Sequence, residues 1–301
     1  MPAELEPDLY RNVLEELPAG LYVVDRSRRI VLWSKGAEDL TGYLSQEAMG
    51  RECGAGLLMH CDLEGVPFCE DHCPLMAAMR EGHAVQSDAF LLHRDGSRIP
   101  IRLNTSPVHS EEGHVVGAST FFMERAPQLA EPLLEQCHTL DPETQLPGYS
   151  ALSQLLAAAL KRMDATGEGF GILLFAIDGL DHLLHVDGRN GTGAVFHTVG
   201  RTLAKNLGPG ERLGRWSQNR LLGIVRACAP AALDRQAEYL RKVARLASAP
   251  WWGERISVTV SASGALASPG NTAASLIERA EAALTAGAGA NRLAPAGDQI
   301  R

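Results

Sequence analysis

The sequence lacks an excess of basic residues and lacks any long apolar run. Its 301 residues contain 28 Lys and Arg against 36 Asp and Glu, a formal net charge of −8. Because a protein that binds nucleic acid needs cations to neutralise the phosphates, this charge argues against a nucleic-acid partner. No stretch approaches the roughly 18 apolar residues that suggest a membrane span. We therefore expect neither nucleic acid nor a membrane span.

The N-terminal residues also lack the basic segment that opens a secretory signal peptide. We therefore expect a cytoplasmic protein, in which cysteines stay reduced. Apolar residues make up 45% and charged residues 21%, which is the balance of an ordinary globular protein. The length is enough for about two domains.

Cysteine is scarce, yet four of the six cysteines lie within the 21 residues 53–73, together with His60 and His72. Thiolates and imidazoles are the side chains that hold zinc or the iron of iron–sulfur clusters. In a reducing compartment such a group favours metal ligands or reactive thiols over disulfides. A thiol with a lowered pKa would instead serve as a redox switch. A loop of small, buried thiols without a function is the third interpretation.

Residues 9–125 carry the patterns of short strands and short helices. One apolar side predicts a helix at 9–17, and two β-rich segments predict strands at 21–25 and 30–33. Asp95-Gly96 and Glu112-Gly113 favour tight turns and predict hairpins. The remaining expected elements are helices at 37–42, 46–49 and 74–80 and strand segments at 89–93, 98–102, 104–108 and 115–122. We expect a five-stranded sheet with helices inserted after its second strand.

Several segments of this half resemble a PAS sensor domain. They are LPAGLYVVD at 17–25, IVLW at 30–33, LTGY at 40–43, MG at 49–50, HRDGSRIP at 93–100 and GHVVG at 113–117. The resemblance covers residues 9–125 and implies a five-stranded antiparallel sheet with helices. PAS domains sense through a ligand held between sheet and helices or through a partner, and sensing without a cofactor stays open. No haem or flavin is indicated, since His93 and His114 lie beside turns and are expected to be solvated.

The same region resembles a cysteine-rich PAS subgroup that is usually joined to cyclase domains. That subgroup carries a Cys, a His-x-Asp and a Cys-x-x-x-Cys-Pro-Leu in its helical loop. The matching residues here are Cys53, His60, Asp62, Cys69 and Cys73. The resemblance favours a common function for Cys53, His60, Cys69 and Cys73. We predict that these four residues form a zinc or iron–sulfur site. Cys61, the odd member, is an open alternative to His60 as a ligand.

A linker at 126–140 is expected to be largely helical after Pro132. Its apolar residues form a seam at i, i+4 and i+7 spacing that suits a parallel partner helix. The residues of this seam are Leu133, Leu134, Cys137 and Leu140. We expect a homodimer through the seam, and a contact within one chain is an alternative of equal standing. Cys137 and Cys228 are expected to be packed thiols.

Residues 141–301 alternate strands and helices in the manner of an α/β domain. The apolar run at 170–177 predicts a strand covered on both faces. Thr192 is expected to cap a helix whose apolar side includes Phe196 and Leu203. The other expected elements are helices at 152–160, 233–243 and 272–286, a hairpin of 212–216 with 221–225, and a strand at 256–262. The whole chain is therefore expected to be a two-domain protein of the α+β / α/β class.

This order of elements resembles the GGDEF domain of diguanylate cyclases, from Asp141 to about Arg292. The matching segments are DPETQLPG at 141–148, FAIDGL at 175–180, GRNGTG at 188–193, RW at 215–216, SVTVS at 257–261 and RAEAAL at 279–284. The resemblance implies a GGDEF-like αβ domain over residues 141–301, with a central mixed sheet. It also implies a place in cyclic di-GMP signalling.

The residues that carry this family's chemistry are replaced. Making cyclic di-GMP needs carboxylates that hold divalent metal over the triphosphate. Ala176 stands where the family has its first metal-binding Asp, and the Gly-Gly-Asp-Glu-Phe signature is Ser-Gln-Asn-Arg-Leu at 217–221. An amide, Asn219, and a cation, Arg220, thus replace the acidic pair. Leu184 and Gly193 stand at the family's two guanine-binding positions, and Asp181 replaces its phosphate-binding lysine. Gly208 replaces the arginine of its product-inhibition site.

Asp178 keeps the family's carboxylate, but one carboxylate makes no metal site, and capping or turn formation is its expected role. The glycines at 188–193 have no Lys-Ser/Thr after them, so we expect the turn of the fold and no phosphate loop. The second domain is therefore predicted to be degenerate, without catalytic residues.

These patterns together predict a cytoplasmic signal-transduction protein. Its PAS domain would sense a metal, redox or small-molecule cue and relay it through a catalytically inactive GGDEF-like domain to a protein partner. A diguanylate cyclase-type enzyme with residual or noncanonical nucleotide activity is the main alternative. A dimeric adaptor without any ligand is the third.

Overall fold

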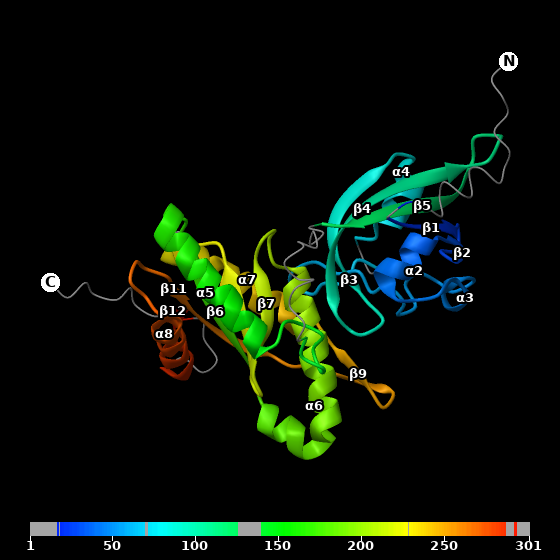
Figure 1. The fold of residues 1–301 in the computed structure, drawn as a ribbon. Helices are drawn as coiled ribbons and strands as arrows, with labels where there is room; N and C mark the ends of the chain where they lie inside the picture. The colour runs from blue at the N-terminus through cyan, green and yellow to red at the C-terminus, as the bar shows by residue number, and fades with distance from the viewer. Residues whose placement is uncertain are drawn as a thin grey trace. The chain divides into compact units, whose positions relative to one another are not determined.

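The computed structural model of the chain describes residue 17 and residues 19–69, 72–125, 140–227, 229–286 and 292–293. The chain divides into two compact units, Met1–Arg125 and Ala126–Arg301 (Figure 1). The expected helix at 9–17 and the linker seam, with Cys137, fall outside the described residues except at their last positions, and Cys228 falls outside them altogether. Among the described helices, none combines the length and the apolar character that crossing a membrane requires.

The first unit is built on a five-stranded antiparallel sheet, as predicted. Its strands are β1 (Gly20–Asp25), β2 (Ile30–Trp33), β3 (Val85–Leu92), β4 (Arg98–His109) and β5 (Val115–Glu124), in the order β2-β1-β5-β4-β3. The two segments expected at 98–102 and 104–108 form the single strand β4. Leu103 continues the pairing between them, opposite Phe122 of β5, so nothing breaks the strand there.

Three described helices accompany this sheet: α2 (Lys35–Thr41), α3 (Ser45–Ala48) and α4 (Pro74–Glu81). Ser34 caps α2 with its hydroxyl, and Gly42 ends it at φ +76°, a conformation that glycine adopts without steric cost. Pro74 opens α4 directly after Cys73. The largest fully buried side chains between sheet and helices include Tyr22, Phe122 and Leu91. Between α3 and α4, the described residues 49–69 and 72–73 form no helix or strand of the fold and carry the cysteine-rich segment.

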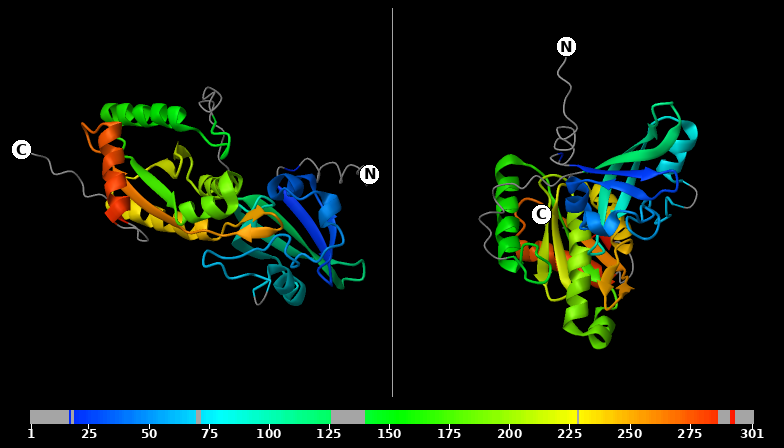
Figure 2. Two further views of the ribbon diagram at one scale, coloured as in Figure 1. Left: turned by 90° about the horizontal axis from the view of Figure 1, so that it is seen from below. Right: turned by 90° about the vertical axis from the view of Figure 1, so that its right-hand side faces the viewer.

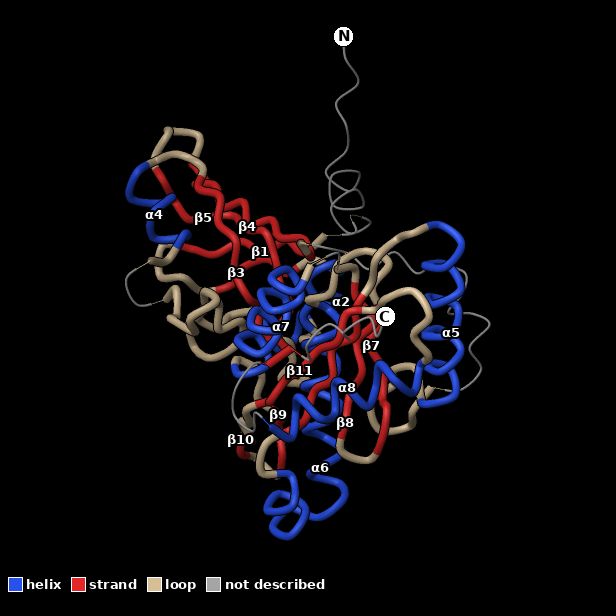
Figure 3. The backbone as a smooth tube through the Cα atoms, turned by 90° about the vertical axis from the view of Figure 1, so that its left-hand side faces the viewer, coloured by secondary structure: helices blue, strands red, loops and turns tan. Residues whose placement is uncertain are grey.

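The second unit is built on a mixed sheet, also as predicted. Its strands are β6 (Gly171–Ile177), β7 (Arg212–Ser217), β8 (Arg220–Val225), β11 (Val260–Leu266) and β12 (Arg292–Leu293), in the order β12-β11-β6-β8-β7. Only β11 and β12 are parallel. The strand expected at 256–262 is wrong in its position, because Ile256 ends a separate hairpin of β9 (Ala249–Trp251) and β10 (Glu254–Ile256). This hairpin lies beside α6 (Figure 3), where a Cβ at Gly191 would stand 3.2 Å from Trp251.

Four helices cover the two faces of this sheet: α5 (Tyr149–Thr166), α6 (Leu180–Lys205), α7 (Pro230–Arg245) and α8 (Ala273–Ala286). Leu173, Phe175 and Ile177 of β6 belong to one core with α6 and α7. Ile172 and Leu174 belong to another core with α5 and α8. Figure 2 shows α5 and α7 on opposite sides of the strands. Successive side chains of a strand point to opposite faces of the sheet. Because helices cover both faces here, both sets of side chains of β6 are buried, which explains its continuous apolar run.

The expected cap at Thr192 is wrong. α6 begins at Leu180 and is interrupted only at Gly188, whose φ of 67° and ψ of −170° separate two helical segments. Thr192 lies inside the second segment, and its Oγ1 donates a hydrogen bond to the Gly188 carbonyl at 2.8 Å. The glycines at 188–193 therefore make a kink between helical segments rather than an open turn.

Candidate functional site

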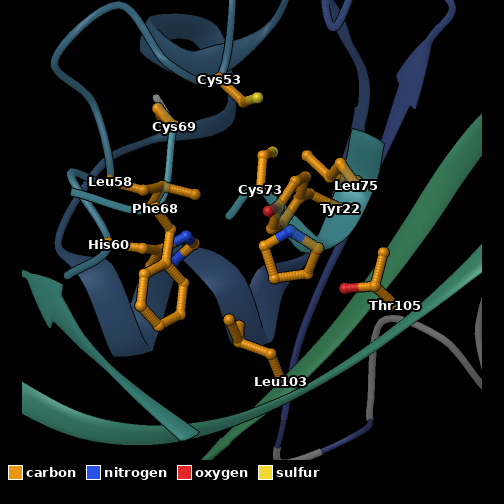
Figure 4. A pocket seen from close by; sticks show the side chains of 11 residues that line it. Tyr22, Cys53, Leu58, His60, Phe68, Cys69, Cys73, Leu75, Leu103 and Thr105 are labelled. Atoms are coloured by element: carbon orange, nitrogen blue, oxygen red, sulfur yellow. The ribbon is translucent and has the colours of Figure 1, made fainter. Parts of the chain in front are cut away.

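The first unit contains a small cavity at the cysteine-rich segment. Its volume is about 10 Å³, which is room for about one water molecule. The residues around it include Tyr22, Cys53, His60, Phe68, Cys69 and Cys73 (Figure 4). All four predicted metal ligands therefore line one cavity. A space of this size holds neither a haem nor a flavin.

Backbone hydrogen bonds position these residues from several directions. The Cys53 N–H donates to the Arg28 carbonyl at 3.0 Å, which ties the segment to the turn after β1. The His60 carbonyl accepts from the Phe68 N–H at 2.9 Å, which folds the segment back on itself. Cys73 is the residue before α4, so the start of that helix fixes its place. Contacts between distant segments thus bring the thiols and the imidazole to the border of one cavity.

The three cysteines of the cavity influence one another electrostatically. Burial, together with the neighbouring Cys73 and Cys69, raises the pKa of the Cys53 thiol to about 12. Figure 4 shows the side chains of Cys53 and Cys73 extending toward each other. Because the pKa of Cys53 is raised, this residue is a protonated thiol at neutral pH and does not have the lowered pKa of a reactive redox cysteine.

His60 is a buried, neutral imidazole. The residue is only 8% exposed, and its Nε2 has no hydrogen-bond partner among the residues that the structure describes. Burial lowers the pKa of His60 to about 4, and the nearby Arg98 guanidinium lowers it as well. His60 is therefore uncharged at neutral pH, which is the form of imidazole that binds metals.

The side chains do not form a ready coordination shell. Among residues 19–69 and 72–125 and the described part of the second unit, no three His, Cys, Asp or Glu side chains are close enough to hold a metal ion as they lie. The four residues border one cavity without forming a coordination group.

Cys61 and His93 lie elsewhere. Cys61 is not among the residues that line the cavity. Its backbone instead exchanges two hydrogen bonds with Phe90 of β3, at 3.2 and 2.9 Å, and burial raises the pKa of its thiol. His93, expected to be solvated, is buried at 8% exposure, with its Nδ1 2.8 Å from an Asp95 carboxylate oxygen. His114 is exposed, as expected.

The second unit contains a larger cavity, of about 530 Å³, beside the turn between β7 and β8. Ser217, Gln218 and Asn219 of the turn line it. Arg215 also lines it, and its guanidinium stacks on the Phe196 ring at 3.7 Å and pairs with Glu143 at 3.2 Å. The same guanidinium donates to the carbonyls of Ser217, at 2.6 Å, and Gln218, at 2.5 Å. Arg215 thus braces the turn from within the cavity.

Asp178 follows directly after β6. Its two carboxylate oxygens accept hydrogen bonds from the Thr259 hydroxyl, at 2.6 Å, and the Ser261 hydroxyl, at 2.7 Å. It lines a different cavity, together with Thr259. The helix that follows is capped by Gly179 without a side-chain bond, so Asp178 ties β6 to β11 instead of capping α6. Ala176 pairs with Arg220 of β8 on one side and with Ser261 of β11 on the other.

Two family models match the chain. The PAS fold model matches residues 8–125, and the model of the diguanylate cyclase GGDEF domain matches residues 138–292. No curated protein matches in sequence.

Solved structures are similar to parts of the chain. Diguanylate cyclase SiaD in complex with its activator SiaC, from Pseudomonas aeruginosa, is 22% identical over 51% of this chain, with a TM-score of 0.49. This chain spans 59% of the length of SiaD. The GGDEF domain of DgcB from Caulobacter crescentus, in complex with c-di-GMP, is 23% identical over 52% of this chain and 95% of that one, with a TM-score of 0.48. The PAS domain of a Colwellia psychrerythraea protein is 22% identical over 39% of this chain and 94% of that one, with a TM-score of 0.34.

Proposed function

Since this chain belongs to the diguanylate cyclase GGDEF family and carries a PAS fold before that domain, it is a cyclic di-GMP signalling protein, and we propose that its GGDEF domain transmits a signal without making cyclic di-GMP. The PAS domain receives a metal, redox or small-molecule cue in this proposal. The GGDEF domain then acts on a protein partner, in the homodimer expected from the linker sequence.

The state of Asp178, the carboxylate that the family pattern retains, supports this proposal most directly. Both oxygens of Asp178 already accept hydroxyl hydrogen bonds from β11 and the residue before it. Holding a divalent cation over a triphosphate requires several oxygen ligands at one point. Residues 217–221 contain no acid, and position 176 is an alanine. Asp178 is therefore engaged by β11 and has no second carboxylate from these positions with which to share a cation.

The charges around the turn support the proposal as well. Arg220 stands opposite Ala176 in the register of β6 and β8, so a cation and a methyl group face each other on adjacent strands. Glu143, an acid in the cavity, is paired with Arg215. A guanidinium repels Mg²⁺, and a carboxylate engaged by an arginine binds it less well. The residues present around the turn therefore do not fit a divalent cation.

The test is an assay of product formation by the full chain. The protein is incubated with GTP and either Mg²⁺ or Mn²⁺, and cyclic di-GMP is separated by chromatography. We expect no more product than a heat-denatured sample gives, while an active diguanylate cyclase run in parallel confirms the conditions. Product that accumulates in proportion to the amount of folded protein would overturn the proposal.

Nucleotide binding is a second candidate function, and the cavity beside the turn favours it. Its volume of about 530 Å³ lies within the usual range of small-molecule sites. Arg189 and Arg215 supply cations at its edge, beside the acids Glu143 and Asp181. Equilibrium dialysis with GTP, with and without Mg²⁺, tests this function. Retention of intact GTP would support binding without turnover, and no retention would exclude this second function.

A further inference from the structure

We propose that the cavity of the PAS domain binds one thiophilic metal ion, of the Zn²⁺ type, through Cys53, Cys69, Cys73 and His60. This inference rests on the proposed sensory role of the PAS domain and names the class of its ligand. It goes beyond the sequence, which left an ion, a cluster and a redox switch open.

The donor set is the first argument. Three thiols and one imidazole make up a Cys₃His set, which is an ordinary ligand set for tetrahedral zinc. The four residues approach from different parts of the segment, and all of them line one cavity (Figure 4). All four side chains that would bind the ion therefore border the same space.

His60 provides the second, independent argument. It is buried to more than nine-tenths, it lines the cavity, and its Nε2 has no partner among the described residues. Buried polar atoms in native proteins are almost always satisfied, so an unpartnered imidazole nitrogen points to a ligand. A neutral imidazole lone pair is a metal donor, and bonding to an ion satisfies it.

The size of the cavity decides which ligand fits. The cavity volume of about 10 Å³ has room for about one water molecule or one ion. A single ion bonded to sulfur at about 2.3 Å and to nitrogen at about 2.0 Å needs no more room than that. An iron–sulfur cluster contains several iron and sulfide atoms, and an organic ligand is larger still. The geometry therefore favours a single ion over both.

The charge around the cavity is compatible with such an ion. Zn²⁺ with three thiolates and a neutral imidazole carries one net negative charge, and the Arg28 guanidinium, which is paired with Glu52, lies near the three cysteines. A Cβ at Gly54 would stand 3.6 Å from the Cys69 Sγ and 3.9 Å from an Arg28 Nη1. Because no three of the donors among the described residues are grouped closely enough to hold an ion as they lie, binding requires the cysteine-rich segment to rearrange around it.

The experiment measures metal binding by the full chain. Protein purified under reducing conditions is stripped with a chelator and titrated with Zn²⁺ in competition with a chromophoric chelator. We expect one zinc ion per chain, and an affinity lowered by about tenfold or more in Cys53→Ser, Cys69→Ser, Cys73→Ser and His60→Ala. Cys61→Ser is the matched control, since Cys61 is an equally buried cysteine of the same segment outside the cavity. We expect this variant to bind zinc as the wild type does.

Titration of the wild type with Co²⁺ needs no variant and so does not depend on how well the variants fold. A thiolate-to-cobalt charge-transfer band of tetrahedral character is the expected result. No binding of Zn²⁺ or Co²⁺, an equal loss of affinity in Cys61→Ser, or iron with sulfide in anaerobically purified protein would each overturn the inference. Cyclic di-GMP made by the zinc-loaded chain would instead overturn the proposed function and leave the metal site standing.

Discussion

Gly214 in β7 is a position where the absence of a side chain decides the packing. A Cβ there would stand 2.1 Å from the Pro147 carbonyl oxygen and 2.9 Å from Leu152. That oxygen cannot retreat easily, because it accepts a hydrogen bond from the Arg215 N–H at 2.8 Å. The close approach joins β7 to the chain that leads into α5.

Replacing this glycine is therefore expected to be costly. Gly214→Ala should destabilise the second unit by about 1–3 kcal/mol, the usual range for overpacking a well-packed site. Gly223→Ala is the matched control on the paired strand, where the nearest atoms to the new Cβ are 3.7 Å away. Thermal unfolding followed by tryptophan fluorescence compares the two variants. Equal melting temperatures would show that the Pro147 contact is not a constraint.

Asp88 in β3 gives a prediction about pH. Its carboxylate accepts a hydrogen bond from Arg102 at 2.9 Å and is near Arg125, and the Arg102 bond is the main reason that its pKa is lowered. A lowered folded-state pKa means that the stabilisation is complete above the unfolded pKa of about 3.9 and is lost as the pH falls through the folded value. Since the carboxylate is 43% exposed, the contribution is below about 1 kcal/mol.

The measurement compares wild type and Asp88→Asn by chemical denaturation from pH 7 to pH 3. We expect the wild type to be slightly more stable at pH 7 and the difference to shrink below about pH 4. A difference that stays constant across this range would mean that the charge of Asp88 plays no part.

At the scale of the element, α2 depends on the cap at its first turn. The Ser34 hydroxyl accepts hydrogen bonds from the Ala37 N–H at 3.2 Å and from the Leu21 N–H of β1 at 2.9 Å. Ser34 is buried, so removing its hydroxyl takes this acceptor from the Leu21 N–H away from water, while the Ala37 N–H keeps the Ser34 carbonyl at 3.0 Å. One hydroxyl thereby fixes both the start of the helix and its attachment to the sheet.

Ser34→Ala is expected to destabilise the first unit by about 1–2 kcal/mol. Ser153→Ala in α5 is the control, because this exposed hydroxyl only bonds back to the Tyr149 carbonyl within its own helix, at 2.8 Å. Its removal should change stability by less than about 0.5 kcal/mol. Circular dichroism melts of both variants decide the matter, and a similar small loss in each would argue against the cap.

Elements were predictable from local pattern wherever they depend on neighbouring residues. The β-rich segment Ile30–Trp33 and the long apolar run at Gly171–Ile177 predicted β2 and β6 at their observed places. The start of α6 was missed, because the apolar stripe after Thr192 hides the shorter helical segment before Gly188. The hairpin of β9 and β10 was missed as well, since two strands of three residues carry too few alternations to detect.

At the scale of the whole molecule, each unit has its own buried core. Tyr22, Leu91 and Phe122 belong to the core of the first unit, while Phe175 and Leu222 belong to the two cores of the second. A separate core is what allows a domain to fold by itself. We therefore expect residues 1–125 and residues 126–301, produced as separate proteins, each to fold.

Circular dichroism and thermal melts of the two fragments test this expectation against the full chain. Each fragment should give a cooperative transition and the secondary structure of its own unit. A fragment that melts without a cooperative transition would show that its core is insufficient alone.

The amino-acid sequence by itself determined the two-domain class, the PAS and GGDEF families and most strands and helices. Strand alternation, helical spacing and turn dipeptides act over a few residues, so a local pattern carries them. The sequence also singled out Cys53, His60, Cys69 and Cys73, which prove to line one cavity.

Only the tertiary structure decided what these residues have around them. The size of the PAS cavity, the unpartnered Nε2 of His60 and the position of Cys61 beside β3 result from contacts between segments far apart in the chain. The engagement of both Asp178 oxygens likewise depends on the hydroxyls of Thr259 and Ser261, some 80 residues away. The spacing of residues along the chain cannot predict such contacts, because the burial and the hydrogen bonds of a side chain depend on which distant segments the fold places next to it.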